Sequence, residues 1–421
     1  MILKFSSNIS PLERKTFILH ILSQFFNGIT LGIISLQDIL LKKTLGGTDH
    51  DVMILSLLIS SSFIVSMYGS EIVNRSENKT KIILLIAAVG KIFLLVIPYI
   101  TNPFFYIICI GANAYMDSLL LPVWNIVFKH NYSDINRSRL YSYASIVQTV
   151  FIIIITSAFG YYLDIYQDIY RYAFPVAALT GFLAYYELAM MIRLSDSTGS
   201  IKYERRRYHF KLKLVKDIIF IPVRNTLRIF RDNPRFFRFE IYFFIYGIAF
   251  IMLTPVIPVF LVDVLKLNYF PISLAKGLIF HSAFIIFTPI MGIYYKNKIP
   301  TSYCGYMFYA LAFFPAILLL SGYFNEHIET IVYLAYFTFG FAMSGVTIAW
   351  TLSSIYYSPP NQVSNYQAVH ITLTGIRGIF SPVLGYIIMI YLDTSSVFIT
   401  SALLFIIAGA LMLLEHRNWK F

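Results

Sequence analysis

Long uninterrupted apolar runs dominate the chain and are separated by short polar stretches. Each run holds about 20 residues, the length that an α-helix needs to cross the hydrocarbon core of a membrane. Continuous runs, rather than short segments of alternating polarity, favour helices over an outer-membrane barrel. The pattern predicts twelve transmembrane helices, over residues 17–41, 52–73, 82–100, 104–128, 141–163, 171–192, 239–262, 273–295, 303–323, 328–355, 368–391 and 397–414.

Composition and charge extend this prediction to an all-α integral membrane protein. Hydrophobic residues make up 58% of the 421 residues and charged residues only 13%, against about 25% charged in soluble proteins. The 33 Lys and Arg residues exceed the 21 Asp and Glu residues. This excess gathers in the connecting segments on one side of the predicted helices. Because Lys and Arg are retained on the cytoplasmic side, we expect a multi-pass inner (plasma) membrane protein with both termini cytoplasmic.

The segment 193–238 interrupts the series of short loops. It carries thirteen Lys or Arg residues against four Asp or Glu residues, among them the run Arg205-Arg206-Arg207. It predicts a basic cytoplasmic linker between two six-helix bundles, residues 1–192 and 239–421. The basic residues either bind anionic lipid headgroups or only follow the positive-inside rule.

The two predicted bundles share an internal repeat. A shift of 225 positions overlays several residues at once, and the matches bracket helices 4 to 5 and 10 to 11. These matches indicate two pseudo-symmetric repeats. They are Tyr132 with Tyr357, Ser133 with Ser358, Asn136 with Asn361, Tyr141 with Tyr366, and Gly160-Tyr161 with Gly385-Tyr386.

Twelve spans, the six-plus-six division and the basic linker together resemble the major facilitator superfamily, over nearly the whole chain. The signature of that family between helices 2 and 3 reads Gly-x-Leu-Ala-Asp-Arg-x-Gly-Arg-Lys. Here residues 70–79 occupy that loop, and Arg75 and Lys79 match it. Asn74 takes the acidic position, and Glu71 is the candidate for the missing carboxylate. The resemblance implies a gating role for Glu71, Asn74, Arg75 and Lys79.

Two opposite charges lie deep in neighbouring predicted helices. Lys91 is nine residues into helix 3 from the cytoplasmic side, about 14 Å at 1.5 Å per residue. Asp117 is thirteen residues into helix 4 from the outside, about 20 Å. A charge at such depth costs about 2.5 to 3.5 kcal/mol even on a mild scale. We therefore predict an ion pair between Lys91 and Asp117, with either a transport or a structural role.

In the family that the chain resembles, helices 1, 4, 7 and 10 line a central cavity. Asn113, Asp117 and Trp124 fall on one stripe of helix 4, so the resemblance places them on the substrate or ion pathway. The resemblance adds one polar or aromatic residue from each of the other three helices, or else these are packing residues: Asn27, Tyr246 and Trp350.

Two further ionisable residues lie within predicted helices of the second half. Arg377, between Gly375 and Gly378, either contacts the substrate or ties its helix to backbone carbonyls, because the glycines let a neighbouring backbone approach closely. His281 is either a proton relay together with Asp117 or a packed histidine.

Motifs for enzymatic chemistry are missing from the sequence. It contains no nucleotide-binding loop, no zinc-protease motif and no hydrolase elbow. Cys109 and Cys304 are too isolated for a metal site. We therefore expect no enzyme, no cofactor, no metal and no nucleic-acid partner.

These observations predict a monomeric secondary transporter that moves a small solute by alternating access. Proton coupling through Asp117 is the sharper version of this hypothesis. A facilitative exchanger or uniporter, or a non-transporting scaffold or receptor with the same fold, is the alternative.

Overall fold

The computed structural model describes residues 9–76, 78–197, 226–296, 298–359 and 362–418. Every regular element in these ranges is a helix, so the all-α prediction is confirmed. Contacts divide the chain into two compact units. The first consists of Met1–Gln37 and Val65–Arg207, and the second of Asp38–Ile64 and Tyr208–Phe421. The predicted division at residues 1–192, 193–238 and 239–421 remains a prediction, and most of the linker, 198–225, lies outside the described residues.

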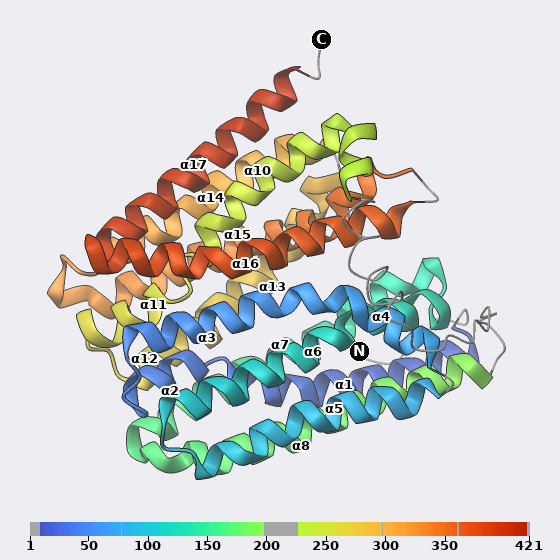
Figure 1. Ribbon diagram of the computed structural model, residues 1–421, viewed down its shortest axis with the longest axis horizontal. Helices are drawn as coiled ribbons and strands as arrows, with labels where there is room; N and C mark the ends of the chain where they lie inside the picture. Colours follow the sequence, from blue (N-terminus) through green and yellow to red (C-terminus); the bar gives the residue numbers. More distant parts are fainter. Residues whose placement is uncertain (1–8, 77, 198–225, 297, 360–361, 419–421) are drawn as a thin grey trace, which may run out of the picture. The chain divides into compact units, whose positions relative to one another are not determined.

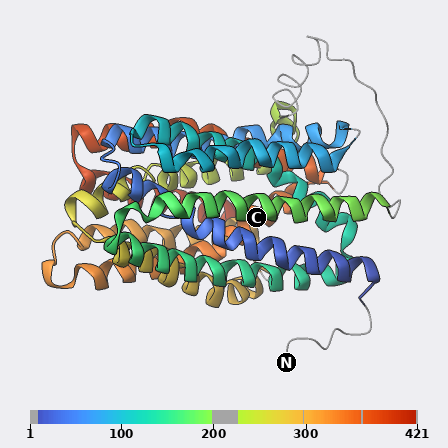
Figure 2. The same cartoon turned by 90° about the horizontal axis from the view of Figure 1, so that it is seen from below.

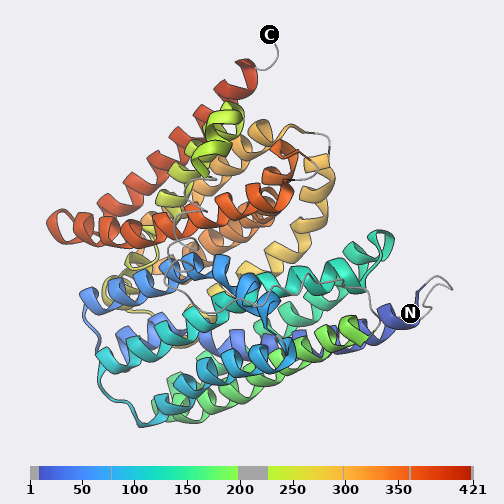
Figure 3. The same ribbon diagram turned by 45° about the vertical axis from the view of Figure 1, so that its right-hand side comes forward.

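The first unit is built around α1. This helix packs along α7 and α8 (Figure 2), and α5 packs against both α6 and α8 (Figure 3). The elements of this unit are α1 (Pro11–Ile34), α4 (Ser66–Arg75), α5 (Lys79–Val96), η2 (Ile97–Tyr99), α6 (Pro103–Asn131), α7 (Asp134–Ile165), η3 (Gln167–Ile169) and α8 (Tyr170–Ser197).

In the second unit, α14 packs against α15 and α17, and α16 packs against both α3 and α10 (Figure 1). Its elements are α3 (Asp49–Ser61), α10 (Pro234–Ile251), α11 (Val256–Val259), η4 (Phe260–Val264), α12 (Tyr269–Ser273), η5 (Leu274–Ile279), α13 (Phe280–Lys296), α14 (Pro300–Leu320), η6 (Asn325–His327), α15 (Ile328–Tyr357), α16 (Val363–Tyr391) and α17 (Thr394–Asn418). The short helices α2 (Gln37–Lys43) and η1 (Ser62–Val65) lie at the two boundaries between the units.

Eleven helical stretches of the described residues are long and apolar enough to cross a membrane. They correspond to eleven of the twelve predicted spans. The remaining span, 52–73, is helical but interrupted, because the 3₁₀ turn η1 separates α3 from α4. At this turn the Ser61 and Ser62 hydroxyls donate to the carbonyls of Leu58 and Ile59. Such local bonds compete with the regular helix ladder.

The repeat predicted from the sequence has a structural counterpart in each unit. In the first unit, the rings of Tyr132 and Tyr141 both lie 6.1 Å from the His20 ring on α1. In the second, the rings of Tyr357 and Tyr366 lie 5.9 and 4.7 Å from the Phe236 ring on α10. The matched tyrosines therefore pack in both units against the helix that begins the half.

Candidate transport site

The first unit holds a hydrogen-bonded group of three side chains, the Lys91–Asn113–Asp117 triad. Lys91 lies on α5, and the other two lie one turn apart on α6, which packs against α5. The Lys91 ammonium is 2.7 and 2.9 Å from the two Asp117 carboxylate oxygens and 2.9 Å from Asn113 Oδ1. Asn113 Nδ2 donates to Asp117 Oδ2 at 3.0 Å. The predicted ion pair is therefore confirmed, and the Asn113 amide connects its two members.

The two charges of the triad differ in exposure. The Lys91 side chain is 4% exposed, whereas that of Asp117 is 31% exposed. A carboxylate offers about four acceptor sites. Lys91 and Asn113 occupy three of those of Asp117, and the Tyr185 hydroxyl of α8 also interacts with this carboxylate. The ring of Tyr185 on α8 lies 5.4 Å from the Lys91 ammonium, a cation–π distance. Asp117 is thus the more exposed of the two charged members of the triad.

Glycine makes room for the Lys91 side chain. A Cβ atom on Gly181 of α8 would lie 2.7 Å from Lys91 Cε and 3.1 Å from Lys91 Cδ. These distances are shorter than van der Waals contact, so the lysine stem fills the space that a side chain would take. The packing of α5 against α8 therefore holds the ammonium toward α6.

The other predicted pathway residues of this unit lie outside the triad. The Trp124 ring on α6 is 5.7 Å from the His20 ring and 5.6 Å from the Phe128 ring. Asn27 is half-buried on α1. Neither Trp124 nor Asn27 makes a hydrogen bond to the triad in the described part of the chain. The sequence pattern did not predict His20, which is buried in an aromatic cluster and bonded to the Tyr132 hydroxyl at 3.2 Å.

In the second unit, three predicted residues come together around α16. Arg377 Nη1 donates to the Phe243 carbonyl of α10 at 2.9 Å, and Nη2 donates to Thr374 Oγ1 at 3.0 Å. The guanidinium lies 5.7 Å from the ring of Tyr246. Trp350 Nε1 donates to the same Thr374 hydroxyl at 3.5 Å. Arg377 is buried, and its bonds in this structure are to a backbone carbonyl and a hydroxyl.

Close backbone packing surrounds Arg377, as the flanking glycines predicted. A Cβ on Gly375 would lie 2.7 Å from the backbone nitrogen of Ile64, and one on Gly378 would lie 2.4 Å from the Ser60 carbonyl oxygen. On α10, a Cβ on Gly247 would lie 2.2 Å from the Arg377 guanidinium. Gly247 therefore provides the slot in which the guanidinium lies.

The same seam between α10 and α16 contains a buried pair that the sequence analysis missed. His370 Nδ1 lies 2.9 and 3.0 Å from the two carboxylate oxygens of Glu240. Glu240 comes directly after Phe239 at the predicted boundary of its span, and its partner is 130 residues away. In the sequence, the signal for this pair was a carboxylate within a run of phenylalanines.

A second group of ion pairs that the sequence analysis missed lies in the second unit, around α2. Lys42 is 2.6 Å from Asp49 and 2.7 Å from Asp263, and Lys276 is 2.7 Å from Asp38. Asp263 and Lys276 lie on η4 and η5, which are both π-helical turns. Such turns are rare and are frequently found at functional sites.

For the remaining predicted site residues, the structure gives the position in the fold and few side-chain contacts. Glu71, Asn74 and Arg75 lie on α4, but their side chains lie outside the described part of the structure. Lys79 is buried at the start of α5. His281 is half-buried on α13, with its ring 4.9 Å from that of Phe280.

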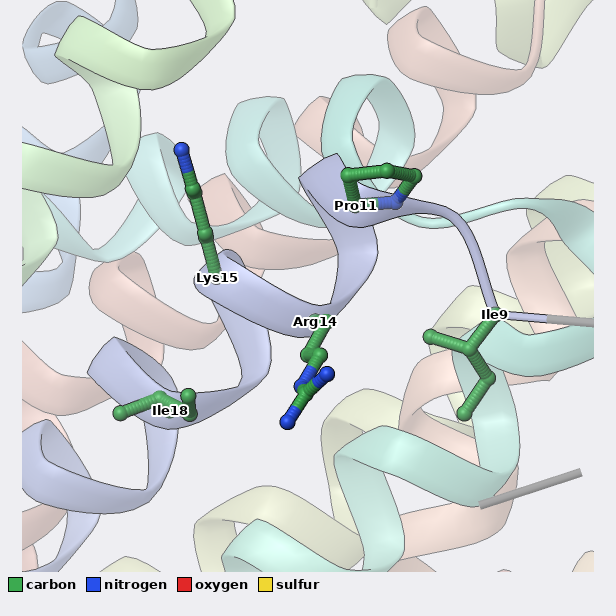
Figure 4. Close-up of a pocket in the computed structure, with 5 residues that line it drawn as sticks. All are labelled: Ile9, Pro11, Arg14, Lys15 and Ile18. Carbon is green, nitrogen blue, oxygen red and sulfur yellow. The ribbon is translucent and has the colours of Figure 1, made fainter.

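A surface hollow lies at the start of α1 in the first unit, and none of the predicted pathway residues lines it (Figure 4). Arg14 and Lys15 are exposed there beside the apolar side chain of Ile18. Exposed cations at the end of an apolar helix are typical of a membrane interface. The hollow is lined by Ile9, Pro11, Arg14, Lys15 and Ile18.

Solved structures of membrane transporters share this fold. One is a peptide transporter POT in complex with sulfate, with a TM-score of 0.72 and 12% identity over 96% of this chain and 94% of that one. Another is the nucleoside transporter NupG, with a TM-score of 0.65 and 13% identity over 96% and 99%. The human organic anion transporter MFSD10 has a TM-score of 0.63 and 12% identity over 96% and 100%.

Sequence comparison gives two further results. No curated protein matches the chain. The family model of the Major Facilitator Superfamily matches residues 16–382. That range covers most of the chain, which therefore belongs to the Major Facilitator Superfamily.

Proposed function

We propose that the chain is a secondary transporter that moves a small polar solute by alternating access, and that the Lys91–Asn113–Asp117 triad binds the coupling proton and the solute. The observation that carries this proposal is the exposure of Asp117. A structural ion pair in a membrane helix bundle gains nothing from leaving its carboxylate accessible, whereas a transport site requires it.

The chemistry of the triad couples the two ligands. With Asp117 ionised, its charge offsets the desolvation of Lys91. A proton on Asp117 removes that compensation and frees the ammonium to bind an acceptor group on the solute. The proton and the solute then change each other's affinity by the same factor, because linkage is reciprocal.

The second unit contributes in this proposal through Tyr246, Trp350 and Arg377. Arg377 binds its own helix pair in the state described and a solute acceptor in another state. The ion pairs of Lys42 and Lys276 hold α2 in one state of the cycle and release it in the other. His281 has the weaker case as a proton relay, because no carboxylate that could pass it a proton is bonded to it among the described residues.

The distribution of charges in the sequence supports a proposal for the membrane and orientation of the transporter. We place it in the inner (plasma) membrane as a monomer with both termini cytoplasmic, with anionic lipids at the basic segment 193–238. Glu71, Asn74, Arg75 and Lys79 form the cytoplasmic gate between helices 2 and 3.

The first test identifies the solute. The solved structures with this fold are named as transporters of peptides, nucleosides and organic anions, so these three classes form the first panel for a thermal-shift screen. A true ligand raises the melting temperature by mass action. The rise should vanish in Asp117→Asn. It should persist in Asp168→Asn, the same change at an exposed pair with Arg171.

The outcome also decides between the alternatives. Solute exchange without accumulation under a proton gradient would indicate a facilitative exchanger or uniporter. A complete absence of ligand-dependent stabilisation across the panel, in a folded protein, would favour the scaffold or receptor. Stabilisation that survives Asp117→Asn would remove the triad from the proposal.

A further inference from the structure

A carboxylate and an imidazole face each other inside the second unit. Glu240 on α10 and His370 on α16 have side chains that are 3% and 1% exposed. His370 Nδ1 lies 2.9 and 3.0 Å from the two Glu240 oxygens. An ionised Glu240 can only accept, so with Glu240 ionised Nδ1 carries the hydrogen, and Nε2 is the atom at which the ring gains or loses its second proton.

Arg377 sets the charge balance of this seam. It lies seven residues after His370 on α16 and interacts electrostatically with Glu240. No carboxylate lies within ion-pair distance of Arg377 among the described residues. An arginine stays charged in proteins, so Arg377 and an ionised Glu240 cancel when His370 is neutral. One added proton leaves the buried seam with an uncompensated positive charge.

The surroundings of Nε2 do not accommodate that charge. Nε2 of His370 and Nε of Arg377 are both buried without a hydrogen-bond partner. The His370 ring lies 4.8 Å from the Phe243 ring and 5.7 Å from the Trp350 ring. A buried donor without an acceptor is unfavourable. Protonation at Nε2 therefore disfavours the close packing of α10 on α16 and favours an arrangement that admits water or a polar group.

Few other titratable groups face the pair. Cys304 on α14 and Tyr357 on α15 interact with Glu240. On α17, Glu415 is engaged with Arg238 at 3.0 Å. On α3, the histidine His50 contacts Tyr386 at the other end of α16. Among the described residues, Tyr246 on α10 and Arg377 on α16 also belong to this surrounding. His50 lies at the other end of α16, so among the groups close to the pair His370 is the one whose charge ordinarily changes between pH 5 and 8.

We propose that the Glu240–His370 pair is a second proton-binding site, and that a proton on His370 Nε2 loosens the packing of α16 against α10. The proton comes from the aqueous phase and adds to the lone pair of Nε2, so no other bond changes. The inference rests on the proposed transport function for its purpose, but the site itself can be measured without any solute.

Trp350 provides the probe, because a protonated imidazole quenches a nearby indole. In the variant Trp124→Phe/Trp419→Phe, Trp350 is the only tryptophan. Its fluorescence, recorded from pH 4.5 to 9 on folded protein in lipid nanodiscs, should fall in one step as the pH decreases. The emission maximum should shift to the red in the same step, as water reaches the indole.

Two variants and a control test whether the fluorescence step comes from protonation of His370. His370→Gln should abolish it, and Glu240→Gln should displace it along the pH axis, because the carboxylate that contacts Nδ1 is removed. His281→Gln, at a different histidine of the second unit, should leave it unchanged. If His370→Gln fails to fold, the shift in Glu240→Gln decides.

Each outcome has one meaning. A step that survives His370→Gln, or fluorescence that does not change with pH, would overturn the proton site. Quenching without a red shift would retain the proton site and overturn the loosening of the seam. A normal titration in a protein that binds and transports nothing would contradict the proposed function and leave this inference intact.

Discussion

Lys91 and Asp117 form an ion pair in which the two side chains differ in exposure: the lysine is buried, whereas the aspartate side chain is 31% exposed. The consequences of removing either charge therefore differ. An unpaired Asp117 can be hydrated or protonated from the exposed side. An unpaired Lys91 stays enclosed by α5, α6 and α8.

This difference predicts unequal losses of stability. Asp117→Asn should destabilise the protein by about 3 kcal/mol, because removing one member of a buried pair leaves the other uncompensated. Lys91→Gln should cost about 1 kcal/mol, close to the loss of hydrogen bonds alone. The double variant should cost less than the sum. Thermal unfolding of the purified variants measures the order, and equal losses for the two single variants would contradict it.

Gly181 should tolerate no side chain. In Gly181→Ala the new Cβ would lie 2.7 Å from Lys91 Cε, so the lysine or α8 must move, at a cost of about 1 to 3 kcal/mol. Ligand-dependent stabilisation should fall as well, because the ammonium is displaced. Gly292→Ala is the matched control, since the nearest atom there is 4.0 Å away. Similar melting temperatures for the two variants would show that Lys91 adapts.

In the second unit, Gly247 should also tolerate no side chain. Gly247→Ala places a Cβ 2.2 Å from the Arg377 guanidinium and should lower stability by about 2 kcal/mol or more. If the clash with Arg377 is the cause, adding Arg377→Met should recover part of the loss. No recovery would point to the α10 backbone instead.

The ion pair between Asp38 and Lys276 near α2 predicts that transport requires opposite charges at these two positions. Lys276→Asp places a carboxylate opposite Asp38 and should reduce transport strongly, because like charges repel at this distance. The swap Asp38→Lys/Lys276→Asp should restore part of it. The control is Lys266→Asp, at an exposed loop residue with φ +53°, where aspartate is tolerated better than most residues. Uptake that is unaffected by Lys276→Asp would separate this pair from the cycle.

Part of the site could be predicted from the sequence, because a charged residue deep in the hydrocarbon core of the membrane needs a partner at a similar depth. Lys91 and Asp117 lie at matching depths on neighbouring antiparallel helices, so their pairing followed from geometry. The glycines beside Arg377 indicated close backbone approach, and Ser60 and Ile64 provide it. In both cases the signal lay within a few residues or within one helical hairpin.

The features that the sequence did not predict depend on pairing across long distances along the chain. Glu240 lies next to the predicted end of its span, where a charge has a small free-energy cost. The sequence therefore does not indicate that Glu240 is buried against His370. Lys42 and Asp263 likewise meet from segments far apart in sequence. The interruption of helix 2 coincides with the local hydroxyl bonds of Ser61 and Ser62, which a hydropathy pattern does not detect.

The central claim is that Asp117 carries the coupling proton. Its most direct test is solute uptake into proteoliposomes under an imposed pH gradient, with the ligand found by thermal shift. We predict that Asp117→Asn abolishes gradient-driven accumulation, while Asp168→Asn accumulates the solute like the unmodified protein. Accumulation by Asp117→Asn at the rate and extent of the unmodified protein would contradict the claim.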